Sequence, residues 1–176
     1  MKILLLILAT CFSMHFSIAG NTTNVIYDTV PQPIGYVNDF EGILKIDEIL
    51  LLDSLIENFE DSTTIQIAIV TLDSSYTAND NFDDYILRIA NIWGVGQATK
   101  NNGIVIGFSS QLRRIRIQNG YGIERIFSDA ETKKVIDDHM VPNFKKAEYF
   151  LGLKEGLVAI TEILGKKLAE VEIKNE

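Results

Sequence analysis

The chain has 176 residues and a formal net charge of −8, with 24 acidic side chains against 16 basic ones. Hydrophobic residues make up 47% and charged residues 23%, the balance of one globular domain rather than of a disordered chain. This acidic charge excludes nucleic acids and anionic membrane surfaces as partners, because phosphate binding needs a basic stripe. Cations remain possible binding partners for a chain with this net negative charge.

The first 19 residues have the features of a secretory signal peptide. Lys2 gives a positive start, the apolar run ILLLILATCF follows, and small residues precede a cut after Ala19. An uncleaved anchor is the alternative, and a lipoprotein at Cys11 is disfavoured because Thr10 stands where Gly, Ala or Ser is needed. No later apolar run is long enough to span a bilayer. We therefore expect export to a periplasm or out of the cell, with no transmembrane helix and no cysteine in the mature chain.

The rest of the chain divides into a lead-in, one domain and a short tail. Residues 20–35 are polar, contain Pro31 and Pro33 and show no sustained period, which predicts an extended linker. The domain is expected over residues 36–168, and residues 169–176 form a charged tail.

The first half of the domain alternates helix and strand patterns. Apolar residues recur at helical spacing over about 47–60, and the β-branched run 65–72 is typical of a strand buried on both faces. Asp80 is the expected N-cap of a second helix, which should end at Gly94.

The second half begins with a hairpin and ends with two helices. Residues 103–108 predict a second buried strand, and residues 112–118 a strand whose exposed face carries Arg114 and Arg116. Ser128 and Glu131 form a capping box for a third helix, which should end before Pro142. A last helix is predicted over 149–164.

This order of elements predicts an α/β fold. The strand–helix–strand unit over 65–108 should be a parallel crossover, and the hairpin adds an antiparallel strand. The expected architecture is a three-layer α/β/α sandwich around a small mixed sheet.

Most catalytic constellations are absent from the sequence. The mature chain has one histidine, His139, whose place near a helix end favours a dipole or packing role. There is no nucleophile-elbow serine, Walker A sequence or strand-linked dinucleotide loop. Serine and cysteine hydrolases, P-loop enzymes and Rossmann oxidoreductases are therefore excluded.

Three loops stand out instead: VNDFEG (37–42), WGVGQATKNNG (93–103) and NGYGIERIFSD (119–129). Gly120 and Gly122 indicate positive backbone angles or close approach of another group. Carboxylates and carboxamides at such loops are ligands for a hard cation, calcium or magnesium. The alternative is that these glycines form turns and these acids cap helices.

The expected topology brings part of this set together. Asn102, Glu124 and Asp129 should meet at the edge of the sheet where the second strand begins. Asp39 either crosses the sheet to join them or lies beside Asp73 at the opposite edge, and the sequence leaves both open.

The motifs VNDFEGIL, WGVGQ, NNGIVI, RRIRIQNGYGIE and VPNF, followed by Tyr149 and Gly152, resemble the TPM domain family over residues 36–164. Gln118 departs from the glutamate of many members. The resemblance implies an α/β/α sandwich, divalent cation binding, acid phosphatase activity and roles in maintaining membrane protein complexes. Carried onto this chain, the cation ligands would be Asp39, Asn102, Glu124 and Asp129, and calcium is favoured over magnesium.

Two hypotheses of function follow. In the first, the protein is a metal-dependent phosphomonoesterase in which Asp39 is the candidate catalytic residue and Arg116 and Tyr121 contact a phosphomonoester. In the second, it is a non-catalytic, calcium-stabilised module that docks on an envelope protein. The lack of an obvious general base favours the second.

Overall fold

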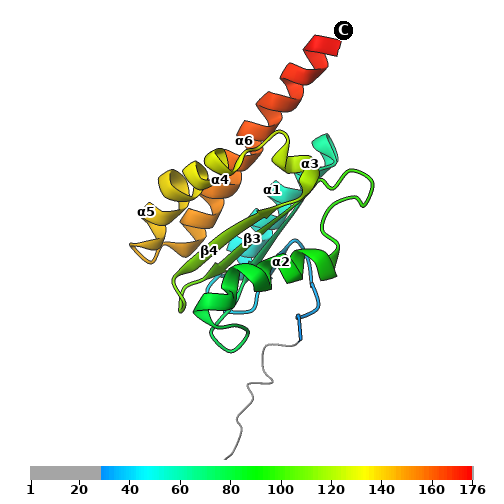
Figure 1. Ribbon diagram of the computed structural model, residues 1–176. Helices are drawn as coiled ribbons and strands as arrows, with labels where there is room; N and C mark the ends of the chain where they lie inside the picture. The colour runs from blue at the N-terminus through cyan, green and yellow to red at the C-terminus, as the bar shows by residue number, and fades with distance from the viewer. Residues whose placement is uncertain (1–28, 176) are drawn as a thin grey trace, which may run out of the picture.

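A four-stranded mixed sheet lies between two layers of helices (Figure 1). The computed structural model describes residues 29–175, so the expected signal peptide and residues 20–28 of the expected linker lie outside it. The strands are β1 (Val37–Asp39), β2 (Gln66–Thr71), β3 (Gly103–Ser109) and β4 (Arg114–Asn119), side by side in that order. Strands β1, β2 and β3 are parallel, and β4 is antiparallel to β3.

The helical segments connect and cover these strands. They are α1 (Ile46–Thr63), the 3-10 turn η2 (Asn79–Asn81), α2 (Phe82–Trp93), α3 (Tyr121–Glu124), α4 (Asp129–Val135), the π-helical η3 (Ile136–Met140), α5 (Val141–Phe144) and α6 (Tyr149–Asn175).

Alternation along β3 divides the core between the two faces of the sheet. Ile104 and Ile106 belong to a cluster that is covered by α1, α4 and α6, whereas Val105 packs under α2. Both clusters are buried, and α2 covers the face of the sheet opposite α1, α4 and α6 (Figure 1). The predicted α/β/α sandwich is therefore confirmed, as is the parallel pairing of β2 with β3.

Strand β1 was not predicted, because VND has only three residues and only one of them, Val37, is apolar. It pairs with β2 in the register Val37 to Ile69 and Asp39 to Thr71. Val37 also donates its backbone N–H to Oδ1 of Asp53 on α1 at 2.9 Å. The loop expected over 37–42 therefore begins as an edge strand of the sheet.

The helix expected to stop before Pro142 does not stop there. The chain passes through the π-helical turn η3 and continues into α5, with Pro142 in its first turn. A proline lacks the backbone N–H that would donate a helical hydrogen bond, and a π turn shifts the register of the backbone hydrogen bonds along the helix. Nδ2 of Asn143 donates to the carbonyl of His139 at 3.0 Å, which satisfies one carbonyl near the break.

The predicted helix boundaries are otherwise close. Gly94 ends α2 in the left-handed conformation, and Ser128 and Glu131 form the expected capping box. The predicted cap at Asp80 is wrong, because that residue lies inside η2 and α2 begins after Asn81.

The last helix is longer than predicted. It continues through residues 169–175, the segment expected to be a charged tail, and projects beyond the body of the domain (Figure 1). Within the part of the chain that the structure describes, no helix is both long and apolar enough to cross a membrane.

Candidate functional site

Asp39 lies at the carboxyl end of the sheet, the end at which β1, β2 and β3 finish. Its Cα is in register with Thr71, the last residue of β2. Asn102 immediately precedes β3, and Glu124 follows β4, so both lie at the amino end. The structure thus decides the alternative that the sequence left open, since Asp39 does not join Asn102 and Glu124 but lies at the edge where Asp73 follows β2.

The Asp39 carboxylate organises its own loop. Oδ1 accepts hydrogen bonds from the N–H groups of Gly42 at 3.1 Å and Ile43 at 3.2 Å, and from the hydroxyl of Thr71. Oδ2 accepts from the N–H of Leu44 at 2.8 Å. These four donors occupy both oxygens, so the side chain fastens the turn between β1 and α1.

Asn38, the neighbouring motif residue, has a similar structural role. It is 1% exposed, and its Oδ1 accepts from the N–H of Ile34 at 2.6 Å while Nδ2 donates to the carbonyl of Gly35 at 2.9 Å. The VND motif therefore ties the lead-in and the following loop to the sheet.

The loop over 93–103 is braced in the same way. Oδ1 of Asn102 accepts from the N–H of Gln97 at 2.8 Å, and its Nδ2 donates to the carbonyl of Thr64 at 2.6 Å. Gly96, with a φ of 97°, donates its N–H to Oε1 of Gln66 at 2.7 Å. Asn102, predicted as a ligand, is buried and holds the entry to β3.

The glycines of the third loop, residues 119–129, allow another segment of the chain to approach closely. This was one of the two explanations expected from the sequence, the other being positive backbone angles. A Cβ on Gly120 would lie 2.4 Å from the carbonyl oxygen of Asn101, and one on Gly122 would lie 2.1 Å from that of Lys100. Neither glycine has a positive φ. The short helix α3 therefore packs directly on the chain that leads into β3.

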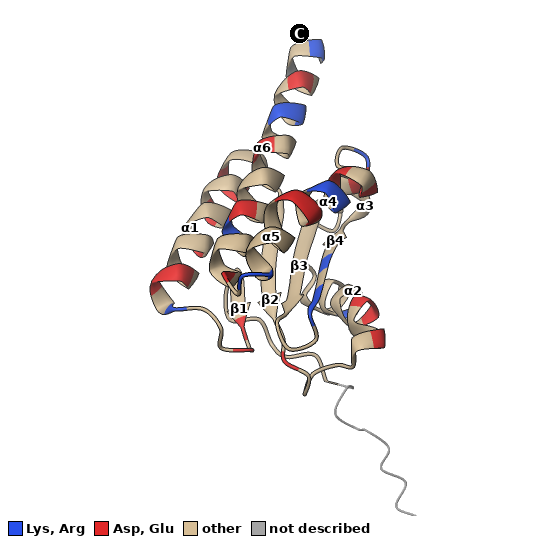
Figure 2. Ribbon diagram, turned by 90° about the vertical axis from the view of Figure 1, so that its left-hand side faces the viewer, with Lys and Arg blue, Asp and Glu red and all other residues tan. Residues whose placement is uncertain are grey.

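Arg116, Tyr121 and Glu124 line one cavity of about 420 Å³. It lies between α2, the exposed face of β4 and α3. Basic residues lie along the β4 ribbon (Figure 2), and Arg116 is the one of them that lines this cavity. Tyr121 is 75% exposed at the rim. Three of the six predicted site residues are thus brought together, although two of them were predicted to bind substrate and one to bind a cation.

The Arg116 guanidinium is only partly used by the protein. Its Nη2 donates to Oε1 of Gln118 at 2.9 Å, and its Nε is buried without a partner among the described residues. Arg114, on the same face, is paired with Asp83 of α2 at 2.7 Å. Arg116 therefore has donors left for a ligand and no ion pair among the described residues.

Sequence reasoning missed several residues of this cavity. Gln118 has the same face of β4 as Arg116 by strand alternation, and Leu87 and Asn91 are four residues apart on α2. These spacings were visible in the sequence. What was missing was the neighbouring position of α2 and β4, which only the fold supplies.

Asp129 and His139 lie elsewhere. Asp129 is exposed in the first turn of α4 and does not line the Arg116 cavity.

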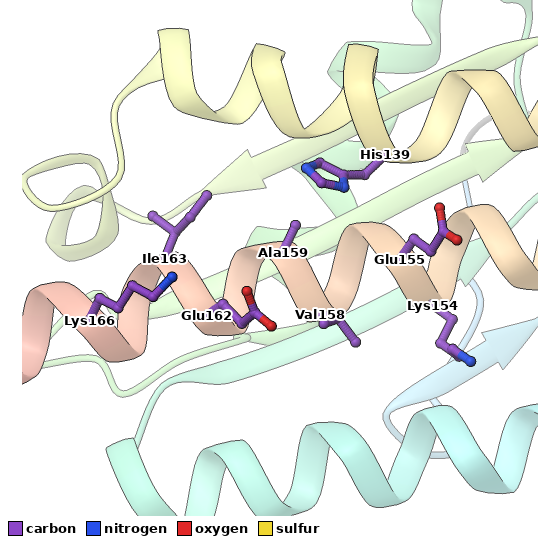
Figure 3. A pocket seen from close by; sticks show the side chains of 8 residues that line it. All are labelled: His139, Lys154, Glu155, Val158, Ala159, Glu162, Ile163 and Lys166. Carbon is purple, nitrogen blue, oxygen red and sulfur yellow. The ribbon is translucent and has the colours of Figure 1, made fainter.

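His139 is exposed on η3 and faces a shallow groove along α6, where Glu155 and Glu162 project from the long helix (Figure 3). Glu155 is engaged there with Nδ2 of Asn143 at 2.7 Å.

The four predicted cation ligands do not fit one cation site. Asp39 is at the other end of the sheet with both oxygens occupied, the oxygen of Asn102 is bonded to the backbone, and Glu124 shares its cavity with the positive charge of Arg116. Among residues 29–175 no three histidine, cysteine or acidic side chains are grouped as metal ligands. The predicted four-residue site is therefore not formed, and cation binding elsewhere stays a prediction.

Comparison with known families identifies the domain. The family model described as the TPM domain, with the label TPM phosphatase, matches residues 37–163. The chain belongs to the TPM domain family. Among proteins of curated function, no sequence is similar enough to count as a relative.

Solved structures show the same TPM fold. The NMR structure of the N-terminal domain of a protein from P. gingivalis is 31% identical, with a TM-score of 0.69, and the match covers 76% of this chain and 84% of that one. The BA42 protein of the psychrophilic bacterium Bizionia argentinensis is 20% identical, with a TM-score of 0.62 and coverages of 73% and 86%. The N-terminal domain of the cg2496 protein from Corynebacterium glutamicum is 15% identical, with a TM-score of 0.53 and coverages of 79% and 83%; like the second, it is similar in fold alone.

Proposed function

We propose that this TPM domain is a binding module that docks on a protein partner through the Arg116 cavity, and that it does not turn over a substrate. One observation carries the proposal. The Asp39 carboxylate, the candidate catalytic group, is bonded to four donors of its own surroundings on the edge strand β1, whereas Arg116 lies on β4 at the other edge of the sheet.

The composition of the cavity supports a protein partner. Tyr121 and Leu87 are 75% and 43% exposed at its rim, and Arg116 lies within it with unused donors. Tyrosine and arginine are the residue types that contribute most to protein interfaces. The carboxamides of Asn91 and Gln118 add hydrogen-bonding groups suited to a polypeptide backbone.

Site-directed photocrosslinking in cells tests this proposal. A photoreactive benzoylphenylalanine at position 121 should crosslink to one protein, and the crosslink should be lost when Arg116→Glu is added. The same amino acid at Leu50, which is 62% exposed on α1, should not give that product. Equal products from both positions, or a product unaffected at Arg116, would remove the cavity as a docking site.

Phosphatase activity is the competing function, and Arg116 and Glu124 in one cavity are the observation that favours it. Purified protein should be assayed with 4-nitrophenyl phosphate in calcium, magnesium or chelator. Our proposal expects that any hydrolysis seen in the wild type is a contaminant, so that Arg116→Gln and Glu124→Gln leave it unchanged. Metal-dependent hydrolysis that is lost in both variants, while the fold is retained, would establish the enzyme and overturn our proposal.

Cation binding is tested separately by titrating calcium into chelator-treated protein and following amide NMR shifts. The structure supports no site made of Asp39 with Glu124, so saturable shifts, if they occur, should be confined to one end of the sheet. Simultaneous shifts around Asp39 and around Glu124 with one affinity would contradict this division.

We also propose that the protein is exported, which rests on the sequence of its first 19 residues. The intact mass of protein isolated from its native cells should correspond to a chain that starts at Gly20. A mass that includes residues 1–19 would instead support an uncleaved anchor.

A further inference from the structure

A second cavity lies at the other end of the sheet and on its other face. It has a volume of about 550 Å³ and is bounded by the end of β3, the β3–β4 hairpin, α5 and the turn into α6. This volume is within the range of small-molecule sites, about 300–1,000 Å³. No residue of this cavity lines the Arg116 cavity, so the two are separate sites.

Three aromatic rings form an apolar wall in this cavity. The ring centroid of Phe144 lies 4.2 Å from that of Phe108 and 6.3 Å from that of Tyr149, and Phe108 and Tyr149 are 5.4 Å apart. Phe108 is only 3% exposed, so the wall continues into the core. Such a wall suits an aromatic or branched apolar group.

The wall is held in place by the helices behind it. A Cβ at Gly152 of α6 would lie 2.4 Å from the Phe144 ring, so a glycine is needed for α6 to approach this ring. Asn143 is buried and bonded both to the carbonyl of His139 and to Glu155 of α6. The VPNF, Tyr149 and Gly152 motifs thus build one preformed surface, which reduces the cost of ordering on binding.

The rim of this cavity is cationic. Arg113 and Lys145 are exposed and form no ion pair within residues 29–175, and the hydroxyl of Tyr149 has no hydrogen-bond partner in that range. Arg114 also lines the cavity but is paired with Asp83. No lining residue is acidic, in a chain of net charge −8.

Besides Asp83, which is paired with Arg114, Glu41 is bonded to a lining residue. Its carboxylate accepts hydrogen bonds from the N–H and hydroxyl of Ser110 at 2.9 and 2.6 Å, and from the N–H of Gln111 at 3.0 Å. These donors keep the carboxylate on the hairpin backbone, away from any ion pair with Arg113 or Lys145. The two rim cations therefore remain available to an anion.

We propose that this cavity binds a small organic anion, an oxyanion joined to an aromatic or branched apolar body. The apolar body lies against Phe108, Phe144 and Tyr149, and the oxyanion lies between Arg113 and Lys145. Burial of the apolar body supplies affinity, and the two rim cations select a negatively charged ligand.

Fluorescence titration of the purified full chain with 8-anilinonaphthalene-1-sulfonate tests this site, with the uncharged analogue N-phenyl-1-naphthylamine as the matched probe. The sulfonate should bind saturably at one site per chain. The Arg113→Gln/Lys145→Gln double variant should weaken its binding about tenfold, since each exposed cation contributes a modest attraction. Binding of the uncharged analogue should stay the same.

The Arg125→Gln/Lys166→Gln double variant is the control, because it makes the same change in net charge without altering the cavity. It should bind the sulfonate as the wild type does. Amide NMR shifts upon addition of the sulfonate should include Ser110 to Ile115 and Lys145 to Tyr149, and the thermal midpoint of each variant should match that of the wild type.

Three results would overturn the site. In the first, both double variants weaken sulfonate binding equally. In the second, the amide shifts are confined to another part of the domain. In the third, the charged and uncharged probes bind with equal affinity and the Arg113→Gln/Lys145→Gln variant changes neither affinity. The last result would mean an apolar cavity without selection for an anion.

Discussion

Asp39 shows how a side chain that resembles a metal ligand can be a structural hydrogen-bond acceptor. A carboxylate that follows an edge strand is equally suited to a cation and to the free N–H groups of a turn. Here the turn has taken it, with the N–H groups of Gly42, Ile43 and Leu44 as donors. Nothing in the local sequence VNDFEG distinguishes the two roles.

Replacing Asp39 should therefore destabilise the domain. In Asp39→Asn one carboxylate oxygen becomes an amide that cannot accept the N–H of Leu44, and the loss should be about 1–3 kcal/mol of unfolding free energy in urea. Asp61→Asn, an exposed position for which no side-chain bond is found in the described chain, is the control and should change it by less than about 0.5 kcal/mol. Equal stability of the two variants would contradict the structural role.

Glycine positions give a pair of substitutions with opposite signs. Gly122→Ala would place a Cβ 2.1 Å from the carbonyl oxygen of Lys100, so α3 must move, and a loss of about 1–3 kcal/mol is expected. Gly165→Ala in α6 meets no atom within 4 Å and should gain up to about 1 kcal/mol through helix propensity. Chemical denaturation measures both, and a stable Gly122→Ala would show that α3 does not need this contact.

At the scale of elements, α4 and α6 are joined by one polar link. Glu131 caps α4 together with Ser128 and accepts a hydrogen bond from Nζ of Lys167 at 2.6 Å. The bond from Lys167, together with those from Ser128, lowers the pKa of Glu131 to about 2 from an ordinary value of 4.5. Because the carboxyl is partly exposed, the energetic effect is modest.

The sign of its pH dependence follows from this lowered pKa. The folded state favours the ionised form, so the contribution of Glu131 is fully present above about pH 4.5 and is lost as the pH falls toward 2. Glu131→Gln should lower the thermal midpoint at pH 7, and its difference from the wild type should shrink below pH 4. Glu162→Gln on the exposed face of α6 should show no such convergence, and a constant difference for Glu131→Gln would contradict the link.

At the scale of the whole molecule, the end of α6 contributes little to the core. Leu168 is the last apolar residue that packs against the core cluster, whereas Val171 and Ile173 are 50% and 74% exposed. The projecting end therefore has no apolar contact of similar depth with the described domain (Figure 1).

Removal of residues 170–176 should consequently shift the thermal midpoint by no more than about 2 °C. Leu164, one helical turn before Leu168, is fully buried, so Leu164→Ala should cost about 2–5 kcal/mol of unfolding free energy. Thermal and urea denaturation of the two variants measures this contrast. A truncated chain that unfolds as readily as Leu164→Ala would show that the projecting helix is part of the cooperative domain.

The sequence by itself determined the parts of this protein that depend on local pattern. Apolar periodicity indicated α1, α2 and the buried strands β2 and β3. Gly94 indicated the end of α2, and Ser128 with Glu131 indicated the start of α4. These signals are local because period and capping depend on neighbours in the chain. Together with the motif order, they were enough for the α/β/α fold and the TPM family.

Only the tertiary structure decided where the polar loops lie. β1 is a three-residue segment with one apolar side chain, Val37, and it becomes a strand by pairing with β2. This pairing sends Asp39 to the carboxyl end while Asn102 and Glu124 lie at the amino end. Likewise, packing of α2 beside β4 makes the Arg116 cavity from residues that the sequence separates. A carboxylate's role depends on which donors reach it, and those donors come from segments that only folding brings together.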